Sequence, residues 1–340
     1  MRRDITLVRL AAGLTILMIS ALAGGCAPTP PYTPTPTRTP DAVALLTGTA
    51  DSAPPVQLSA TLPAPTVEPT QIETPTPTAT LTNGEMFSLD HNWLSRPLPN
   101  DAEHTYLDRT YPYGSTSNGK LRPHTGGDFF NPEGTPVLAA ADGVVVVAGT
   151  DAETLYGPES NFYGNLIILE HPDLTYVGQT VYTLYGHLSR IEVAVGDPVT
   201  VGQEIGRVGG TGIANGGSHL HLEVRLGDPL DYMTATRNPD LWLEPYPGYG
   251  TLAGRVTSAD GELVRGVSLT VENEERIFFL TTYEGEENQP DDLLGENFTY
   301  GDIPVGTYTV SVVNDITGKL YRQQVTILDG RTTWVAFQFE

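Results

Sequence analysis

The stretch that decides the fold is Ser218-His219-Leu220-His221-Leu222-Glu223-Val224-Arg225. Polar and apolar residues alternate along all of it, which is the pattern of a β-strand whose side chains point in turn to opposite faces. In such a strand His219 and His221 share one face, while the apolar residues pack on the other. Two neighbouring imidazoles on a polar strand face are placed to bind a metal and its water, but two solvated surface histidines would show the same spacing.

Short apolar runs separated by Gly, Asn and Asp continue on both sides of this stretch. The runs have strand length and are often β-branched, and no segment keeps a helical spacing for more than a turn or two. We therefore predict an all-β fold. The strands are expected at residues 144–147, 166–169, 181–184, 199–201 and 220–225 and, beyond a Pro/Gly break at 245–248, at 252–257, 267–271, 308–313, 324–328 and 333–339.

The N-terminus has the features of a secretory signal. Three arginines among the first nine residues precede an apolar run at 10–22, which is short for a bilayer span. Small residues then lead directly to Cys26, the single cysteine of the chain. This segment resembles the lipobox of bacterial lipoproteins, and the resemblance implies removal of residues 1–25, lipidation of Cys26 and attachment to a membrane through the lipid anchor only.

The following segment has the composition of a stalk. Residues 27–85 contain 13 Pro and 15 Thr among 59 residues, too few of them large and apolar to form a core. Such a chain is extended, at up to about 3.1 Å per residue. The predicted organisation is a signal peptide at 1–25, a Thr/Pro-rich disordered linker at 26–90, a first β-domain at 91–247 and an accessory β-sandwich at 248–340.

Charge and cysteine content exclude several classes of protein. The chain has 18 Lys+Arg against 41 Asp+Glu, a formal net charge of -23. Binding to nucleic acid or to an anionic membrane surface depends on basic patches, so neither is expected as a partner. One cysteine allows no intrachain disulfide framework. These counts identify no substrate, and they leave the oligomeric state open.

Two further histidines are candidates for chemistry. His124 and Asp128 stand in His-Thr-Gly-Gly-Asp, where the glycines leave the backbone free to bend both side chains toward one point. With a histidine of the 218–225 strand they would form a set of two His and one Asp, which leaves one tetrahedral position open, as in catalytic zinc sites. His187 follows the expected strand at 181–184 in Tyr-Gly-His-Leu; on its own it fits a core histidine equally well.

The order of these blocks carries a resemblance. His-x-x-x-Asp at 124–128, Tyr-Gly-His-Leu at 185–188, a Gly-rich segment at 196–206 and the 218–225 strand follow one another as in the lysostaphin-type (LytM-like) zinc endopeptidases, a family of murein hydrolases. The segment that resembles this family covers about residues 122–245. The resemblance implies a lysostaphin-like antiparallel β-sheet domain of the duplicated-hybrid-motif type.

The resemblance also implies roles for five residues. The zinc ligands of the family fall on His124, Asp128 and His221, and its two unliganded active-site histidines fall on His187 and His219, with the general base left open between them. Because inactive relatives usually lack one or more of these positions, the intact set favours an enzyme. The implied function is a zinc-dependent endopeptidase that hydrolyses peptide cross-links of peptidoglycan at the cell envelope.

Other functions stay open at this stage. The main alternative is a non-catalytic envelope protein that binds wall peptides or regulates another murein hydrolase. A further one is a peptidase for a protein or a glycine-rich peptide. Which peptidoglycan bond would be cleaved is not indicated by the residues.

The last part of the chain resembles a second family. Ile303-Pro304-Val305-Gly306-Thr307-Tyr308 is similar to the corner of carboxypeptidase regulatory-like domains, which are prealbumin-like β-sandwiches and usually serve as spacers or binding units. The remaining expectations are a solvated loop at 284–292, a turn at His171, surface positions for His91 and His104, and at 150–163 either a wall of a substrate groove or a solvated loop.

Overall fold

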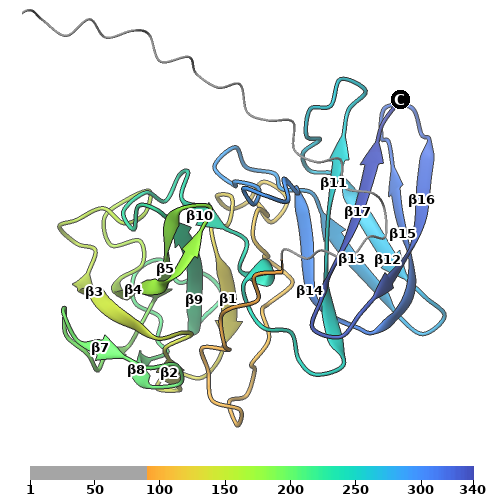
Figure 1. Cartoon of the computed structure of the whole chain (residues 1–340). Coiled ribbons are helices and arrows are strands. Elements are labelled where there is room, and N and C mark those ends of the chain that lie inside the picture. Colours follow the sequence, from red (N-terminus) through yellow and green to blue (C-terminus); the bar gives the residue numbers. More distant parts are fainter. Residues whose placement is uncertain (1–89) are drawn as a thin grey trace, which may run out of the picture. The chain divides into compact units, whose positions relative to one another are not determined.

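A computed structural model describes residues 90–340, which all belong to one compact unit. The predicted signal peptide, Cys26 and the predicted linker up to residue 89 lie outside the described residues. Within the described part the only helix is the 3₁₀ turn η1 (Pro239–Leu241), and all other regular elements are strands (Figure 1). The all-β prediction is therefore confirmed. None of the helical structure in this part is long and apolar enough to span a bilayer.

The first half of the described chain builds one large antiparallel sheet. Its order is β1 (Gly127–Phe130), β9 (His219–Leu226), β5 (Gln179–Gly186), β4 (Asn165–Tyr176), β3 (Gly143–Thr150) and β7 (Pro198–Val199), and β10 (Thr236–Arg237) also pairs with β9. A smaller sheet has the order β2 (Pro136–Leu138), β8 (Glu204–Arg207) and β6 (Arg190–Ile191). Strand β9 thus lies between β1 and β5 (Figure 1).

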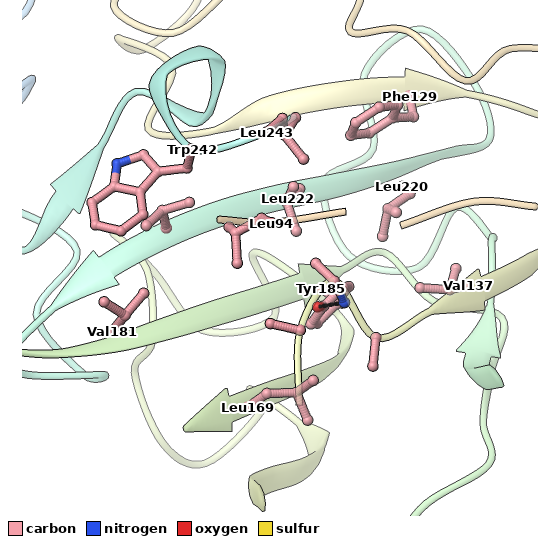
Figure 2. Close-up of a cluster of buried hydrophobic side chains, with 14 of the residues drawn as sticks. Leu94, Phe129, Val137, Leu169, Val181, Tyr185, Leu220, Leu222, Trp242 and Leu243 are labelled. Carbon is pink, nitrogen blue, oxygen red and sulfur yellow. Dashed lines mark hydrogen bonds between the residues drawn. The ribbon is translucent and has the colours of Figure 1, made fainter. Parts of the chain in front are cut away.

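The two faces of β9 divide the core from the candidate site. Leu220, Leu222 and Val224 are fully buried in the main hydrophobic cluster, where Figure 2 shows the first two beside Leu94 and Tyr185. Burying each such side chain stabilises the fold by roughly 1.5–3 kcal/mol. The opposite face carries polar residues that are also buried, at 3% exposure or less: His219, His221, Glu223 and Arg225. The alternative of solvated surface histidines is therefore wrong.

The second half forms a β-sandwich of two sheets. One sheet has β11 (Tyr249–Thr257) between β14 (Phe298–Pro304) and, in parallel, β17 (Thr332–Gln338). The other has the order β13 (Ile277–Thr281), β12 (Ser268–Glu272), β15 (Gly306–Val313) and β16 (Leu320–Ile327). The Pro304–Gly306 corner carries the chain from the first sheet to the second. The strands β13 and β14 were not among the predicted ones.

Two histidines expected at the surface or in a turn are buried. His171 lies inside β4, fully buried, with its Nδ1 2.8 Å from the Asp142 carbonyl oxygen and its Nε2 2.8 Å from Thr183 Oγ1. The turn prediction is wrong because β4 continues past Pro172 through an irregularity in its pairing with β5. His91 is 2% exposed, and its ring centroid is 4.5 Å from that of Trp242. His104 is partly exposed.

The expectation of a solvated acidic loop is also wrong. Residues 283–297 connect β13 to β14 and are named here the 283–297 loop. Asn288, Asp291 and Glu296 in this loop are 2%, 2% and 0% exposed, and Leu294 belongs to the main hydrophobic cluster. The loop therefore packs against the residues of the large sheet, and only some of its side chains, such as those of Glu286 and Asp292, are exposed.

Glu296 should make stability depend on pH. Burial, followed by the nearby charge of Asp291, raises the pKa of its carboxyl to about 8. The folded state then holds a proton that the unfolded chain, with a pKa near 4.5, releases, so the stability from this group is lost as pH rises from about 4.5 to about 8. We expect Glu296→Gln to remove this loss, which amounts to a few kcal/mol. Urea unfolding at pH 5 and pH 8 measures this change in the free energy of unfolding. If the free energy of unfolding changes equally with pH in the variant and the wild type, the raised pKa of Glu296 is contradicted.

Candidate metal centre and active site

The pairing of three strands brings the candidate residues together. In the antiparallel register, Asp128 of β1 stands opposite His221 of β9, and Gly186 of β5 stands opposite the same histidine from the other side. His187 follows directly after β5. The His-x-x-x-Asp turn approaches β9 closely at Gly126, where an added Cβ would collide with the Leu222 carbonyl oxygen and with the His221 ring. Only glycine allows this approach.

His124, Asp128 and His221 offer three donor atoms that face one another. His221 Nδ1 is 2.9 Å from Asp128 Oδ1 and 3.1 Å from His124 Nε2, and the latter is 3.3 Å from Asp128 Oδ1. Ligands at about 2.0–2.1 Å from a tetrahedral zinc ion lie about 3.4 Å apart, so the three atoms need only separate slightly to hold one. Among the described residues this is the one group of three metal-binding side chains brought so close.

Hydrogen bonds on the far side of each ring fix which nitrogen is free. His124 Nδ1 is 2.6 Å from the Tyr111 carbonyl oxygen, and His221 Nε2 is 3.1 Å from Glu223 Oε1. Because a carbonyl or carboxylate oxygen only accepts, each of these nitrogens carries the proton. The opposite nitrogens, His124 Nε2 and His221 Nδ1, face the shared donor position, so they are the atoms that would bind a metal once free of a proton, as in metal sites whose ligands are oriented by outer partners.

His187 and His219 lie beside this donor set. Their ring centroids are 4.8 Å apart, and the His187 ring is 5.7 Å from that of His221. The Nδ1 of His187 donates to the Thr211 carbonyl oxygen at 2.8 Å, and that of His219 donates to the Gly217 carbonyl oxygen at 2.9 Å. His187 also has a φ of 61°, a left-handed conformation that costs a non-glycine residue free energy and is enriched at functional sites.

The electrostatics of the site separate neutral from charged groups. Burial, followed by the neighbouring His221 and His219, lowers the pKa of His187 to about 3, and burial also lowers the pKa of His219. Burial acts against ionisation of Asp128, but the charges and hydrogen bonds of His124 and His221 together outweigh it and hold the pKa of this carboxyl well below its usual value. At neutral pH the site therefore presents two neutral imidazoles beside an ionised carboxylate.

A buried polar network behind His221 was missed in the sequence analysis. Glu223 Oε1 accepts hydrogen bonds from His221, from Tyr163 OH at 2.6 Å and from Thr125 Oγ1 at 2.6 Å, while its Oε2 accepts from Arg225 Nε at 2.7 Å. Burial opposes ionisation of Glu223, but the charge of Arg225 lowers the pKa of the carboxyl below its usual range. The signal was present in the 218–225 alternation, which puts these two residues on the histidine face.

A cavity of about 260 Å³ opens over the site. All five predicted site residues line it: His124, Asp128, His187, His219 and His221. Glu159 and Phe162 form part of its wall. Residues 150–163 therefore contribute to the wall of this cavity, in line with the expectation of a groove wall. Tyr111 and Arg122 also line the cavity.

The donor set and its surroundings define a class of site. Two imidazole nitrogens and one carboxylate oxygen suit Zn²⁺, and three protein ligands leave a fourth position for water or substrate. A three-ligand centre of this kind, within a cavity and beside two neutral histidines, is typical of metal-dependent hydrolases.

Comparison with known proteins agrees with this class. Residues 122–232 match the model of peptidase family M23. Peptidoglycan DD-endopeptidase ShyA of Vibrio cholerae is 38% identical over 117 residues, which are 34% of this chain and 24% of that protein. DD-carboxypeptidase/endopeptidase Mpg of Neisseria meningitidis is 36% identical over 154 residues, 44% of this chain and 31% of that protein.

The chain thus spans about a quarter to a third of the length of these two curated relatives. Among solved structures, the catalytic domain of the antimicrobial peptidase lysostaphin from Staphylococcus simulans is 32% identical, with 41% of this chain and 90% of that chain covered and a TM-score of 0.31.

Proposed function

We propose that the protein is a zinc-dependent endopeptidase that hydrolyses peptide cross-links of peptidoglycan. The observation that carries this proposal is the convergence of His124 Nε2, Asp128 Oδ1 and His221 Nδ1 in a cavity that His187 and His219 also line. Zinc in such a site supplies a Lewis acid for the peptide carbonyl and activates a water molecule. Hydrolysis adds that water across the C–N bond and releases one new carboxyl and one new amino terminus.

The two remaining histidines would divide the work of proton transfer and charge stabilisation. Both are neutral at pH 7 and carry their proton on Nδ1, so the free lone pair of each ring is on Nε2. With zinc bound, one would take the proton of the attacking water and pass it to the leaving amine, and the other would lie beside the oxygen on which negative charge develops. The geometry is compatible with either assignment of these two roles.

The substrate class rests on the relatives. ShyA and Mpg carry names that describe peptidoglycan DD-endopeptidase and DD-carboxypeptidase/endopeptidase activities. Residues 91–247 would form the peptidase domain, and the intact set of five site residues favours an enzyme over a non-catalytic wall-binding or regulatory protein.

The direct test uses purified protein with zinc and isolated peptidoglycan. We expect a falling turbidity and, by mass spectrometry, fragments with new amino termini at one type of peptide bond. Asp128→Ala is the control, because it loses a metal ligand while leaving the cavity walls in place. If the wild type releases no more than this variant from any wall chemistry, the enzyme proposal fails. Cleavage of oligoglycine with intact muropeptides left alone would favour a different peptide substrate.

Zinc binding should release a proton. Burial opposes protonation of His221, but hydrogen bonds to Asp128 and Glu223 outweigh it and raise the pKa of the metal-free ring to about 9. The ring is therefore protonated at pH 7 and must lose that proton before Nδ1 can bind zinc. We expect release of about one proton per zinc at pH 7 and a gain in apparent affinity of about tenfold per pH unit up to about pH 9. Calorimetry in two buffers with different heats of ionisation measures the number of protons released per zinc. If no proton is released at pH 7, the raised pKa of His221 is contradicted.

The proposed location is the outside of the cell, at the envelope. Peptidoglycan lies there, and the lipobox-like segment before Cys26 would anchor the protein to a membrane by lipid. The linker at 26–90 would act as the spacer, and residues 248–340 as an accessory domain of the carboxypeptidase regulatory-like type. Cys26→Ala should move the protein from the membrane fraction to the soluble fraction; an unchanged distribution would count against lipid anchoring.

A further inference from the structure

The β-sandwich contributes directly to the surroundings of the candidate metal centre. The 283–297 loop places Asn288, which is 2% exposed, next to the His-x-x-x-Asp turn. Its Nδ2 donates to the carbonyl oxygen of His124 at 2.7 Å, and the same oxygen accepts from Gly114 N at 2.9 Å. A side chain from the second half of the chain therefore holds the backbone of a proposed zinc ligand.

The loop is fixed against this turn over several residues. Glu284 N donates to the Gly114 carbonyl oxygen at 2.8 Å, and Glu284 Oε2 accepts from Thr116 Oγ1 at 2.7 Å. Gly285 lies so close to the ring of Pro123 that an added Cβ would collide with it. Because Pro123 precedes His124, the loop touches the turn both before the ligand and at the ligand.

The segment held by the loop also orients the His124 ring. Tyr111 stacks on that ring with centroids 4.2 Å apart and an angle of 9°, and its carbonyl oxygen accepts the Nδ1 proton. His124 N donates to the Ser115 carbonyl oxygen at 3.0 Å. Ring and backbone of the ligand are thus confined between residues 111–116 and Asn288, and residues 114–116 are themselves bonded to the loop.

We infer that Asn288 is a positioning residue for the metal centre, and that the β-sandwich acts through the 283–297 loop to hold His124 in its metal-binding position. The inference rests on the proposed zinc site. It assigns the second half of the chain a part in metal binding, where the sequence resemblance implied a spacer or a binding unit. Partners that orient a metal ligand typically change metal affinity by about 10- to 100-fold when they are removed.

The first test compares two variants of the same loop. Asn288→Leu keeps the branched shape and the number of side-chain heavy atoms, and it removes the donor to His124. Asp292→Ala removes the ion pair with Arg237, at 2.8 Å, and so loosens the loop at a place that does not touch His124. Zinc affinity is measured by competition with a chromophoric chelator, and unfolding is followed in parallel on the metal-free proteins.

We expect Asn288→Leu to bind zinc about 10- to 100-fold more weakly, and Asp292→Ala to stay within about threefold of the wild type. The inference is overturned if Asn288→Leu binds zinc as tightly as the wild type. It is also overturned if both variants lose the same zinc affinity, because that would indicate a general effect of loop stability. If the wild type itself binds no zinc, the proposed function fails, and this result differs from both outcomes that overturn the inference.

A second test uses the unaltered protein and is independent of whether the variants fold. Coupling between two sites is reciprocal, so a loop that stabilises the zinc site is itself stabilised by zinc. We expect amide hydrogen exchange in residues 284–291 to speed up when zinc is removed, with little change in β15 (Gly306–Val313). Equal exchange in the loop with and without zinc would overturn the inference.

Discussion

Replacing His221 with alanine should reduce bound zinc from about one equivalent to nearly none and lower peptidoglycan hydrolysis by at least about 10³-fold. His221 is the central donor, because it faces Asp128 on one side and His124 on the other, at 2.9 and 3.1 Å. Two remaining ligands do not make a stable tetrahedral zinc site. Metal analysis of the dialysed protein and the rate of amino-terminus release measure the two effects.

The matched control is His187→Ala, which removes an imidazole from the same cavity without removing a ligand. We expect it to keep about one zinc and to lose activity by about 10²- to 10⁴-fold, the usual contribution of a general acid–base group. Loss of zinc in this variant, or full activity in His221→Ala, would contradict the proposed division between ligands and catalytic groups.

Replacing Arg225 with alanine should lower the free energy of unfolding by about 3–5 kcal/mol, because it leaves the buried carboxylate of Glu223 without its charged partner. Arg225 is fully buried and donates to Glu223 Oε2 at 2.7 Å, to the Pro229 carbonyl oxygen at 2.7 Å and to the Tyr156 carbonyl oxygen at 2.8 Å. Urea unfolding of the metal-free protein measures the change.

The control for this prediction is an exposed pair in the same part of the chain. Arg190 Nε lies 2.9 Å from Glu192 Oε1, and the Arg190 side chain is 67% exposed. Solvent screens such a pair, so Arg190→Ala should cost no more than about 1 kcal/mol. Equal costs for the two arginine variants would mean that the Glu223 network does not stabilise the fold.

Much of the fold could be predicted from local patterns. The alternation at 218–225 predicts a strand with one apolar face, and the structure buries Leu220, Leu222 and Val224 on that face. A period of two is a strong signal because it is imposed by the pleat itself. The convergence of His124 and His221, which are 97 residues apart in the chain, could not follow from spacing and came from the family resemblance.

The burial of His91, His171 and the 283–297 loop depends on partners outside the neighbouring sequence. The residues beside His171 and His91 in the sequence predict a turn and a surface position. The burial of His171 depends on Thr183 of the neighbouring strand β5, and that of His91 depends on Trp242, which lies far along the chain. The acidic composition of the 283–297 loop predicts a solvated loop. Arg237 and the other groups that bind the loop belong to another segment of the chain, so the loop sequence does not show them.

The pairing of β1 with β9 has a consequence for folding kinetics. Asp128 and His221 are separated by 93 residues, so their contact closes a long loop, and such contacts form late in folding. Zinc then has no assembled site to bind until the sheet is nearly complete. The ion should leave the folding rate almost unchanged and slow unfolding, so loss of the metal should set the lifetime of the folded protein where zinc is scarce.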